Sequence, residues 1–166
     1  MRKTLLLTSF LITSSFIFAQ KKPLDHSVYD IWQNLANEKI SNKGNFVGYA
    51  VTPQAGDAEF HIKNLKSNQN FQYPRGEEFK FSLDEKFAAF TIKPTYQETR
   101  QAKIKKKKAD DLPKDSLGII NLKTLALIKI PRIKSYAFAE KVGNVLAYLV
   151  DKDPTDTVKK KKPVSK

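Results

Sequence analysis

The residues with the greatest capacity for chemistry are two histidines and one pair of neighbouring acids. His26 and His61 are far apart in the chain, and Asp110 and Asp111 are adjacent in a polar segment. A nucleophilic serine of the hydrolase type requires a Gly-x-Ser-x-Gly elbow and a base that a third group orients. None of the six glycines forms that elbow. We therefore assign no catalytic residue and expect both histidines to be structural or exposed.

The sequence also lacks the patterns of metal and cofactor sites. The chain contains no cysteine, which excludes disulfides and thiolate ligands. Two separated histidines give no ligand spacing, and no Gly-rich phosphate loop is present. We read Asp110 and Asp111 as solvated acids. The expectation is no metal ion and no cofactor.

Lysine runs give the chain its charge of +13, which results from 30 basic and 17 acidic residues. Most of the excess lies in Arg100–Lys108 and in Lys159–Lys162. Blocks of like charge are typical of solvated segments, although they also bind polyanions by counterion release. Aromatic residues are not interleaved with these lysines, so stacking of bases is not indicated. We expect exposed loops, with weak polyanion contact at most and no nucleic-acid partner.

The first nineteen residues have the pattern of a cleavable signal peptide. Arg2 and Lys3 precede an uncharged run, Leu5–Phe18, which ends at Ala19 and Gln20. This run is shorter than the roughly 20 apolar residues that span a bilayer. An uncleaved anchor is the alternative. The sequence therefore predicts a signal peptide at residues 1–19, export to the periplasm or the cell exterior, and one mature domain at residues 20–166.

The mature part contains an internal repeat. Two copies of it match at three places. Ile62–Ser67 matches Ile119–Thr124 and Pro74-Arg75 matches Pro131-Arg132, both at an offset of 57 residues. Ala89-Phe90 matches Ala147-Tyr148 at an offset of 58. Ser41–Val51 also matches Ser82–Ile92, at an offset of 41. We assign the difference to a lysine-rich insertion at residues 93–116. A second lysine-rich segment occupies residues 151–166.

A period near 41 residues is typical of β-propeller blades. Short aromatic and β-branched runs follow clusters of turn residues at Phe46–Val51, Phe87–Ile92 and Val145–Val150. Such strands also suit a sandwich or a barrel, but the long repeat favours a propeller. The predicted fold is all-β: a partial β-propeller of about two to three antiparallel blades, preceded by a short helix at Leu24–Leu35. Residues Gln97–Lys108 are compatible with a helix or with disorder.

Several segments resemble the amino-terminal region of exported bacterial serine peptidases of the prolyl oligopeptidase family: His26–Trp32, Ile40–Gly44, Thr99–Lys103, Lys114–Gly118 and the Asn-Leu-Lys-Thr turn. The resemblance implies an amino-terminal β-propeller that gates or positions peptides for a carboxy-terminal α/β-hydrolase domain. On this reading the chain is a propeller fragment that is not catalytic by itself, and peptides are its partners through the hydrolase domain. Two alternatives stay open: a non-enzymatic periplasmic binding module for a protein or an anionic envelope polymer, and a polyanion-binding surface protein.

Overall fold

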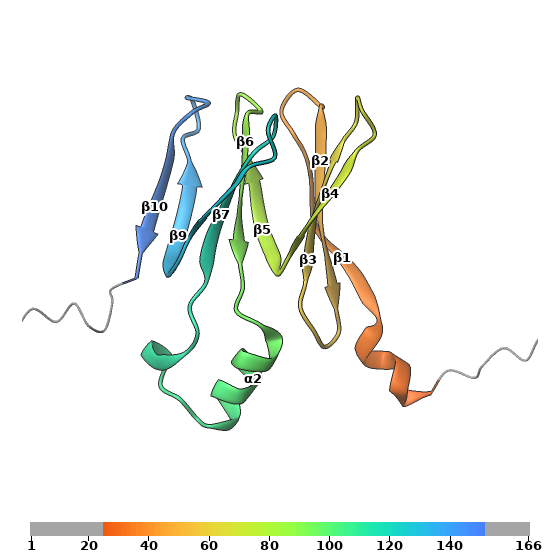
Figure 1. Ribbon diagram of the computed structural model, residues 1–166, viewed down its shortest axis with the longest axis vertical. Helices are drawn as coiled ribbons and strands as arrows, with labels where there is room; N and C mark the ends of the chain where they lie inside the picture. Colours follow the sequence, from red (N-terminus) through yellow and green to blue (C-terminus); the bar gives the residue numbers. More distant parts are fainter. Residues whose placement is uncertain (1–24, 152–166) are drawn as a thin grey trace, which may run out of the picture.

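The computed structural model describes residues 25–151, which form three antiparallel sheets in chain order (Figure 1). Blade 1 contains β1 (Gln33–Ile40), β2 (Phe46–Pro53), β3 (Glu59–Asn64) and β4 (Asn70–Pro74). Blade 2 contains β5 (Gly76–Phe81), β6 (Phe87–Ile92), β7 (Ser116–Asn121) and β8 (Leu127–Ile130). Blade 3 contains β9 (Ile133–Phe138) and β10 (Leu146–Val150). Within each blade, each strand pairs with the next one along the chain, so the predicted all-β fold of two to three antiparallel blades is confirmed.

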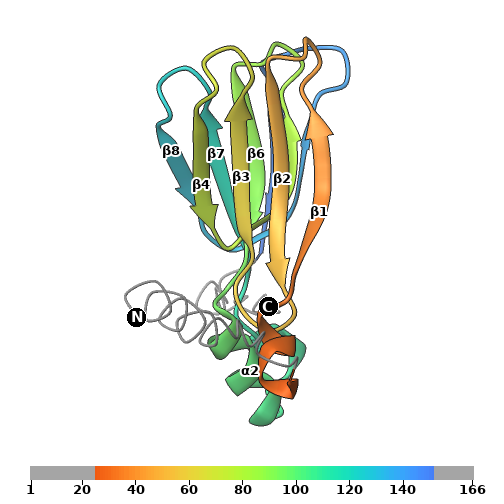
Figure 2. The ribbon, with the colours of Figure 1, turned by 90° about the vertical axis from the view of Figure 1, so that its right-hand side faces the viewer.

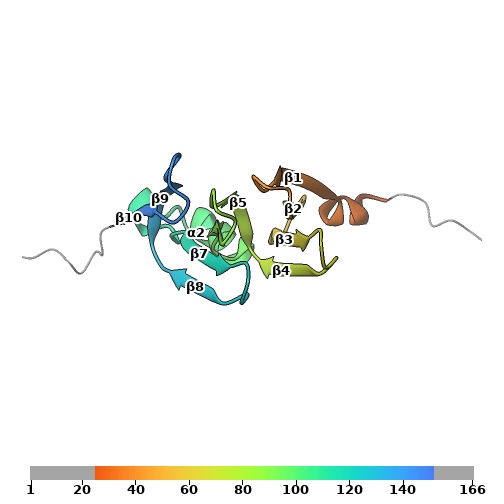
Figure 3. The ribbon, with the colours of Figure 1, turned by 90° about the horizontal axis from the view of Figure 1, so that it is seen from above.

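The blades stand side by side, and their first strands share one side of the stack. Seen from above, β1 and β5 lie on one side and β4 and β8 on the other (Figure 3). Because propeller blades are arranged radially about an axis, we call the side of β1, β5 and β9 the axial side. The β1–β2, β3–β4, β5–β6, β7–β8 and β9–β10 connections lie at one end, the turn end. The β2–β3 connection and α2 lie at the opposite end, the helix end (Figures 1 and 2).

The Asn-Leu-Lys turns connect the outer two strands of blades 1 and 2, as the repeat predicts. Asn64 Oδ1 accepts hydrogen bonds from the backbone N–H groups two and three residues later, at 2.9 and 3.1 Å. Asn121 Oδ1 accepts the equivalent pair at the same two distances. An asparagine that bonds to its own backbone two residues on stabilises such a turn without help from the rest of the fold.

The turns between first and second strands explain why the offset grows from 57 to 58. Ser41 Oγ and Ser82 Oγ each accept a hydrogen bond from the backbone N–H five residues later, at 2.9 and 3.0 Å. In blade 3, Ala139 occupies this position, and its N–H donates to the carbonyl of Val145, six residues later, at 3.0 Å. The turn of blade 3 therefore has one extra residue, which moves β10 one position later in the sequence repeat.

A third repeated feature marks the start of each blade. The carbonyl oxygen of the residue immediately before each first strand accepts a backbone hydrogen bond. These residues are Trp32, Arg75 and Arg132. The donor is the backbone N–H that follows the second strand of the same blade, at 2.8, 2.9 and 2.6 Å. Arg75 and Arg132 also share a left-handed conformation, with φ of 61° and 59°. The Pro-Arg repeat therefore forms the sharp connections between blades.

The lysine-rich insertion lies between β6 and β7, where the offsets place it. It contains the helix α2 (Tyr96–Ile104) and the short 3₁₀ helix η3 (Ala109–Asp111). Thr95 and Glu98 form a capping box, in which Glu98 N–H donates to Thr95 Oγ1 at 3.1 Å and Thr95 N–H donates to Glu98 Oε2 at 3.2 Å. The choice between helix and disorder is thus settled as helix for residues 96–104. The Thr-x-x-Glu pattern is the signal that indicates it.

The predicted helix at Leu24–Leu35 is wrong in length. The structure has a 3₁₀ helix, η2 (His26–Ile31), with Asp25 as its N-cap. Leu35 belongs to β1 instead, where it pairs with Val51 and is 70% exposed. Backbone pairing with β2 outweighs the helical spacing of the apolar residues, because alternate residues of β1 exchange backbone hydrogen bonds with their partners in β2. Leu24 lies outside the described residues.

The hydrophobic core lies between the blades. Phe60 of blade 1 stacks on Phe79 of blade 2, with ring centroids 4.4 Å apart, and contacts Phe90 at 5.0 Å. Between blades 2 and 3, Leu117 and Ile133 are buried in a smaller cluster. The aromatic residues of the repeat therefore pack blade on blade, as expected.

Two predicted segments lie outside the described residues, namely the signal peptide at residues 1–19 and the lysine run at residues 159–162. Within residues 25–151, no helix has the length and apolar character needed to cross a membrane.

Candidate functional site

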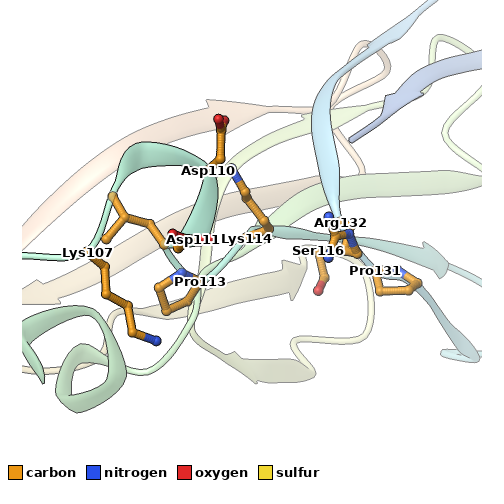
Figure 4. A pocket seen from close by; sticks show the side chains of 9 residues that line it. Lys107, Asp110, Asp111, Pro113, Lys114, Ser116, Pro131 and Arg132 are labelled. Carbon is orange, nitrogen blue, oxygen red and sulfur yellow. The ribbon is translucent and has the colours of Figure 1, made fainter. Parts of the chain in front are cut away.

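A cavity of about 530 Å³ opens at the helix end, between the insertion and blade 3 (Figure 4). The insertion supplies one wall, and the connection between blades 2 and 3 supplies the other. The lining is strongly charged: Lys107, Asp110, Asp111, Leu112, Pro113, Lys114, Ser116, Pro131 and Arg132. The predicted solvated acids, Asp110 and Asp111, are exposed and lie at its rim.

One ion pair joins the insertion to the end of blade 3 beside this cavity, and another joins the two ends of the insertion. Lys114 Nζ and Lys134 Nζ each lie 3.2 Å from a carboxylate oxygen of Asp151. Hydrogen bonds from Lys134 and then Lys114 hold the pKa of Asp151 below its ordinary value. Lys93 Nζ donates to Asp115 Oδ2 at 2.8 Å. Burial alone would lower the pKa of Lys93, but the bond and charge of Asp115 outweigh it and raise that pKa.

The amino-terminal end of the insertion is attached to blade 1. The backbone N–H of Tyr96, at the start of α2, donates to Asp57 Oδ1 at 2.6 Å. The first N–H groups of a helix have no partner inside the helix, so an acceptor from blade 1 satisfies one of them. Together with the Lys114–Asp151 pair, this contact makes the insertion a bridge across all three blades.

A second cavity, of about 520 Å³, lies toward the turn end on the axial side. Its walls come from the first strands of all three blades and from the turns that follow them: Lys39, Ile40, Asn42, Lys80, Phe81, Ser82, Leu83, Ala137, Phe138, Ala139 and Glu140. Lys39 Nζ donates to the carbonyl of Phe79 at 3.4 Å and lies 5.8 Å from the centre of its ring. This mixture of apolar side chains and ammonium groups suits noncovalent contact with an extended chain rather than bond breaking.

Glu85 joins blades 1 and 2 at the turn end, and the sequence analysis missed it. It is only 8% exposed, and its carboxylate accepts hydrogen bonds from Lys43 N–H and from the Asn45 side chain in blade 1. Burial acts to raise its pKa, but hydrogen bonds from Ser41, Asn45 and Lys43 outweigh that effect, so the pKa lies below its ordinary value. The repeat could have drawn attention to Glu85. At the offset of 41 residues, Glu85 aligns with Gly44, and both residues have positive φ in their turns.

The two histidines occupy different parts of the molecule. His26 is exposed in η2 and meets the ring of Tyr29 edge-on at 5.0 Å. His61 is buried in β3, where it stacks on Tyr49 at 4.9 Å and lies 3.1 Å from Glu59 Oε2. In the described part of the chain, no set of three His, Cys, Asp or Glu residues is arranged to hold a metal ion.

Comparison with known proteins gives matches among solved structures alone. No protein-family model matches the sequence, and no curated protein matches it. The chain is similar to the β-propeller domain of the trilobed protease from Pyrococcus furiosus, with 20% identity and a TM-score of 0.51. That alignment covers 70% of this chain and 34% of the other.

Two peptidase structures align more weakly. An acylaminoacyl peptidase in complex with a chloromethyl ketone has 20% identity and a TM-score of 0.48, over 68% of this chain and 16% of the other. The uncomplexed acylaminoacyl peptidase of Pyrococcus horikoshii has 19% identity and a TM-score of 0.47, over 69% and 16%. This chain thus spans about a third or less of the length of each structure.

At this level of identity the likeness establishes the fold. The trilobed protease domain is a β-propeller, and the repeated hydrogen bonds that mark the start of each blade in this chain extend from Trp32 to Asp151. Residues 33–150 therefore form two four-stranded blades and two strands of a third blade of a β-propeller, similar to the propeller domains of prolyl oligopeptidase-family peptidases.

Proposed function

We propose that this chain is the propeller portion of an exported serine peptidase of the prolyl oligopeptidase family. In that role the blades position or gate peptide substrates for a hydrolase domain and perform no hydrolysis themselves. The observation that carries the proposal is the succession of blades, which resembles the trilobed protease propeller domain. The resemblance of segments such as His26–Trp32 to this family supports it independently.

The axial cavity suits the proposed contact with peptides. Three first strands contribute to it, and its apolar residues, such as Phe81 and Phe138, lie among charged side chains. A peptide in extended form can use apolar contacts there for affinity, while Lys39, Lys80 and Glu140 contact its polar groups.

The test examines the protein in its source cells. An antibody raised against residues 25–151 is used to isolate the native protein, which is then treated with a fluorophosphonate probe that labels activated serines. We expect a product much larger than 18.9 kDa that the probe labels. Recombinant chain of 166 residues is the matched control, and it should remain unlabelled.

The opposite result favours a different class of protein. A native product no larger than 18.9 kDa, without probe labelling, would contradict the peptidase proposal. It would support the alternative of a non-enzymatic binding module for a protein partner or an anionic envelope polymer. Stoichiometric labelling of the recombinant chain, abolished by His26→Ala or His61→Ala, would instead contradict the non-catalytic assignment.

Export is the second part of the proposal. It is supported by the basic head and the short uncharged run that ends at Ala19. Mass spectrometry of the secreted or periplasmic form should find Gln20, free or cyclised, at the amino terminus. An intact terminus in the membrane fraction would support the uncleaved anchor instead.

A further inference from the structure

Six cationic side chains gather at the far end of the insertion. Arg100 and Lys103 lie in the second half of α2, and Lys105, Lys106, Lys107 and Lys108 follow the helix. All six are exposed, and Figures 1 and 2 show that this part of the insertion projects beyond the sheets at the helix end. We call these six residues the basic tip.

The insertion that carries the basic tip is attached to the blades at both of its ends. The Tyr96–Asp57 hydrogen bond attaches the start of α2 to blade 1, at 2.6 Å. The Lys114–Asp151 ion pair attaches the segment after η3 to the end of blade 3, at 3.2 Å. The capping box stabilises the helix between these points. The charges are thus presented from an ordered element, which lowers the conformational entropy that is lost when a partner binds.

The charges of the basic tip are not neutralised within the described part of the chain. None of its six residues forms an ion pair among residues 25–151, whereas Lys93 and Lys114 of the same insertion do. Asp110 and Asp111, the acids that follow the tip, are exposed and lie at the cavity rim. Six like charges in nine residues repel one another, and an external anionic surface would relieve that repulsion.

An apolar side chain sits within the basic tip. Ile104 is 63% exposed and lies between Lys103 and Lys105 in the sequence. An exposed aliphatic residue among lysines suits the boundary between lipid headgroups and acyl chains. Nucleic acid would instead favour aromatic side chains for base stacking, and residues 100–108 contain none.

We propose that the basic tip docks this protein on an anionic membrane surface, with the lysines contacting lipid phosphates and Ile104 entering the headgroup region. Each basic residue near such a surface strengthens binding about fivefold at low ionic strength, so several together give stable association. Docking at the helix end leaves the turn end and its axial cavity accessible to other molecules.

The test measures binding of the full chain to vesicles. Phosphatidylcholine vesicles with and without phosphatidylglycerol are compared by co-sedimentation at low and at high ionic strength. We expect binding only to the phosphatidylglycerol vesicles, and weakening as salt increases. The tip variant replaces four lysines by glutamine: Lys105, Lys106, Lys107 and Lys108. Its partition coefficient for phosphatidylglycerol vesicles should fall more than tenfold.

A matched control removes the same charge elsewhere. It replaces four exposed lysines of the blades by glutamine: Lys66, Lys123, Lys129 and Lys141. This control should lose less than threefold, by a rough allowance for long-range electrostatics. All variants share the rest of the sequence, so any contribution from residues 1–24 cancels. Circular dichroism confirms that each variant is folded.

Ile104→Ser distinguishes lipid from nucleic acid as the partner. It should weaken vesicle binding by several-fold, and it should leave retention on duplex DNA unchanged. Equal losses for the tip variant and the matched control would overturn the proposal. So would an Ile104→Ser variant that binds vesicles like the parent, or a parent chain that binds duplex DNA more tightly than phosphatidylglycerol vesicles at the same ionic strength.

Discussion

At the scale of single residues, glycines leave room for phenylalanine rings both between and within the blades. Gly48, Gly76 and Gly118 all lie where the ring of a neighbouring phenylalanine occupies the space of a side chain. A Cβ atom at Gly118 would lie 2.6 Å from the ring of Phe90, which is shorter than any van der Waals contact. Because both residues lie in the middle of blade 2, neither backbone is free to move away.

Gly118→Ala should therefore destabilise the protein by about 1–3 kcal/mol, the usual cost of overpacking a core. Urea unfolding monitored by circular dichroism measures this change. In the Phe90→Leu background the smaller side chain relieves the clash, so the same substitution should cost less there. If the costs in the two backgrounds are equal, the close approach of Phe90 is not the cause.

The buried carboxylate of Glu85 gives a prediction about pH. Its folded-state pKa lies below the ordinary value of 4.5, so its contribution to stability is present above pH 4.5 and is lost as pH falls through the lower folded-state value. Glu85→Gln should cost about 1–2 kcal/mol at neutral pH, because it weakens charge-assisted hydrogen bonds to blade 1.

The difference in unfolding free energy between the parent and Glu85→Gln should shrink as the pH is lowered below 4.5. Urea titrations across that range measure it. Glu140→Gln, which changes an exposed carboxylate, is the control and should show little effect. A difference that stays constant down to strongly acidic pH would argue against the ionised carboxylate as the source.

At the scale of elements, the insertion is a helix whose position depends on a neighbouring blade. The Thr95–Glu98 capping box is local, but the N–H of Tyr96 finds its acceptor, Asp57, 39 residues earlier in the chain. A nine-residue helix is marginal by itself, since isolated helices need about 12–15 residues to form in water. Tertiary attachment therefore contributes to its order.

Asp57→Ala should loosen α2 and speed trypsin cleavage at Arg100 and Lys103, because an N–H group of the first turn loses its partner. Mass spectrometry of early digestion products gives the rates. Cleavage at Lys63 in β3 serves as an internal reference and should stay slow. Asp110→Ala, which removes an exposed acid of the insertion itself, should leave the rates unchanged. An equal effect of both variants would show that the Tyr96–Asp57 contact is unimportant.

At the scale of the whole molecule, blade 3 presents an open strand. Within residues 25–151, β10 pairs only with β9, and its Tyr148, Leu149 and Val150 are about half exposed. Unpaired strand edges with apolar side chains are templates for association with another chain.

The purified chain of 166 residues should therefore self-associate at high concentration, and Leu149→Lys should reduce that association. A charge on an edge strand opposes pairing with another copy. Sedimentation velocity measures the fraction of monomer. Leu65→Lys, which places the same charge in an exposed hairpin turn, is the control and should behave like the parent. An equal increase in the monomer fraction for the two variants would indicate a general effect of charge rather than an effect at the strand edge.

Features that depend on local hydrogen bonds and on the repeat can be predicted from the sequence. Asn64 and Asn121 form turns with their own backbone, so matching segments predict matching turns, and the interval between copies predicts the position of the insertion. The blade count follows from the same comparison, because each copy is one meander. The lengths of the leading helix and of α2 were not determined in this way.

Contacts between groups that are distant in the sequence depend instead on how the blades pack. Leu35 joins a strand because β2 offers its backbone a partner, and Glu85 is buried because blade 1 supplies three hydrogen-bond donors to its carboxylate. Asp57 holds α2 for the same kind of reason. Local patterns report the bonds that a segment makes with itself, whereas these contacts join residues about 40 positions apart or belong to strand pairing. They exist only once the blades are packed, because packing brings their partners within hydrogen-bond distance.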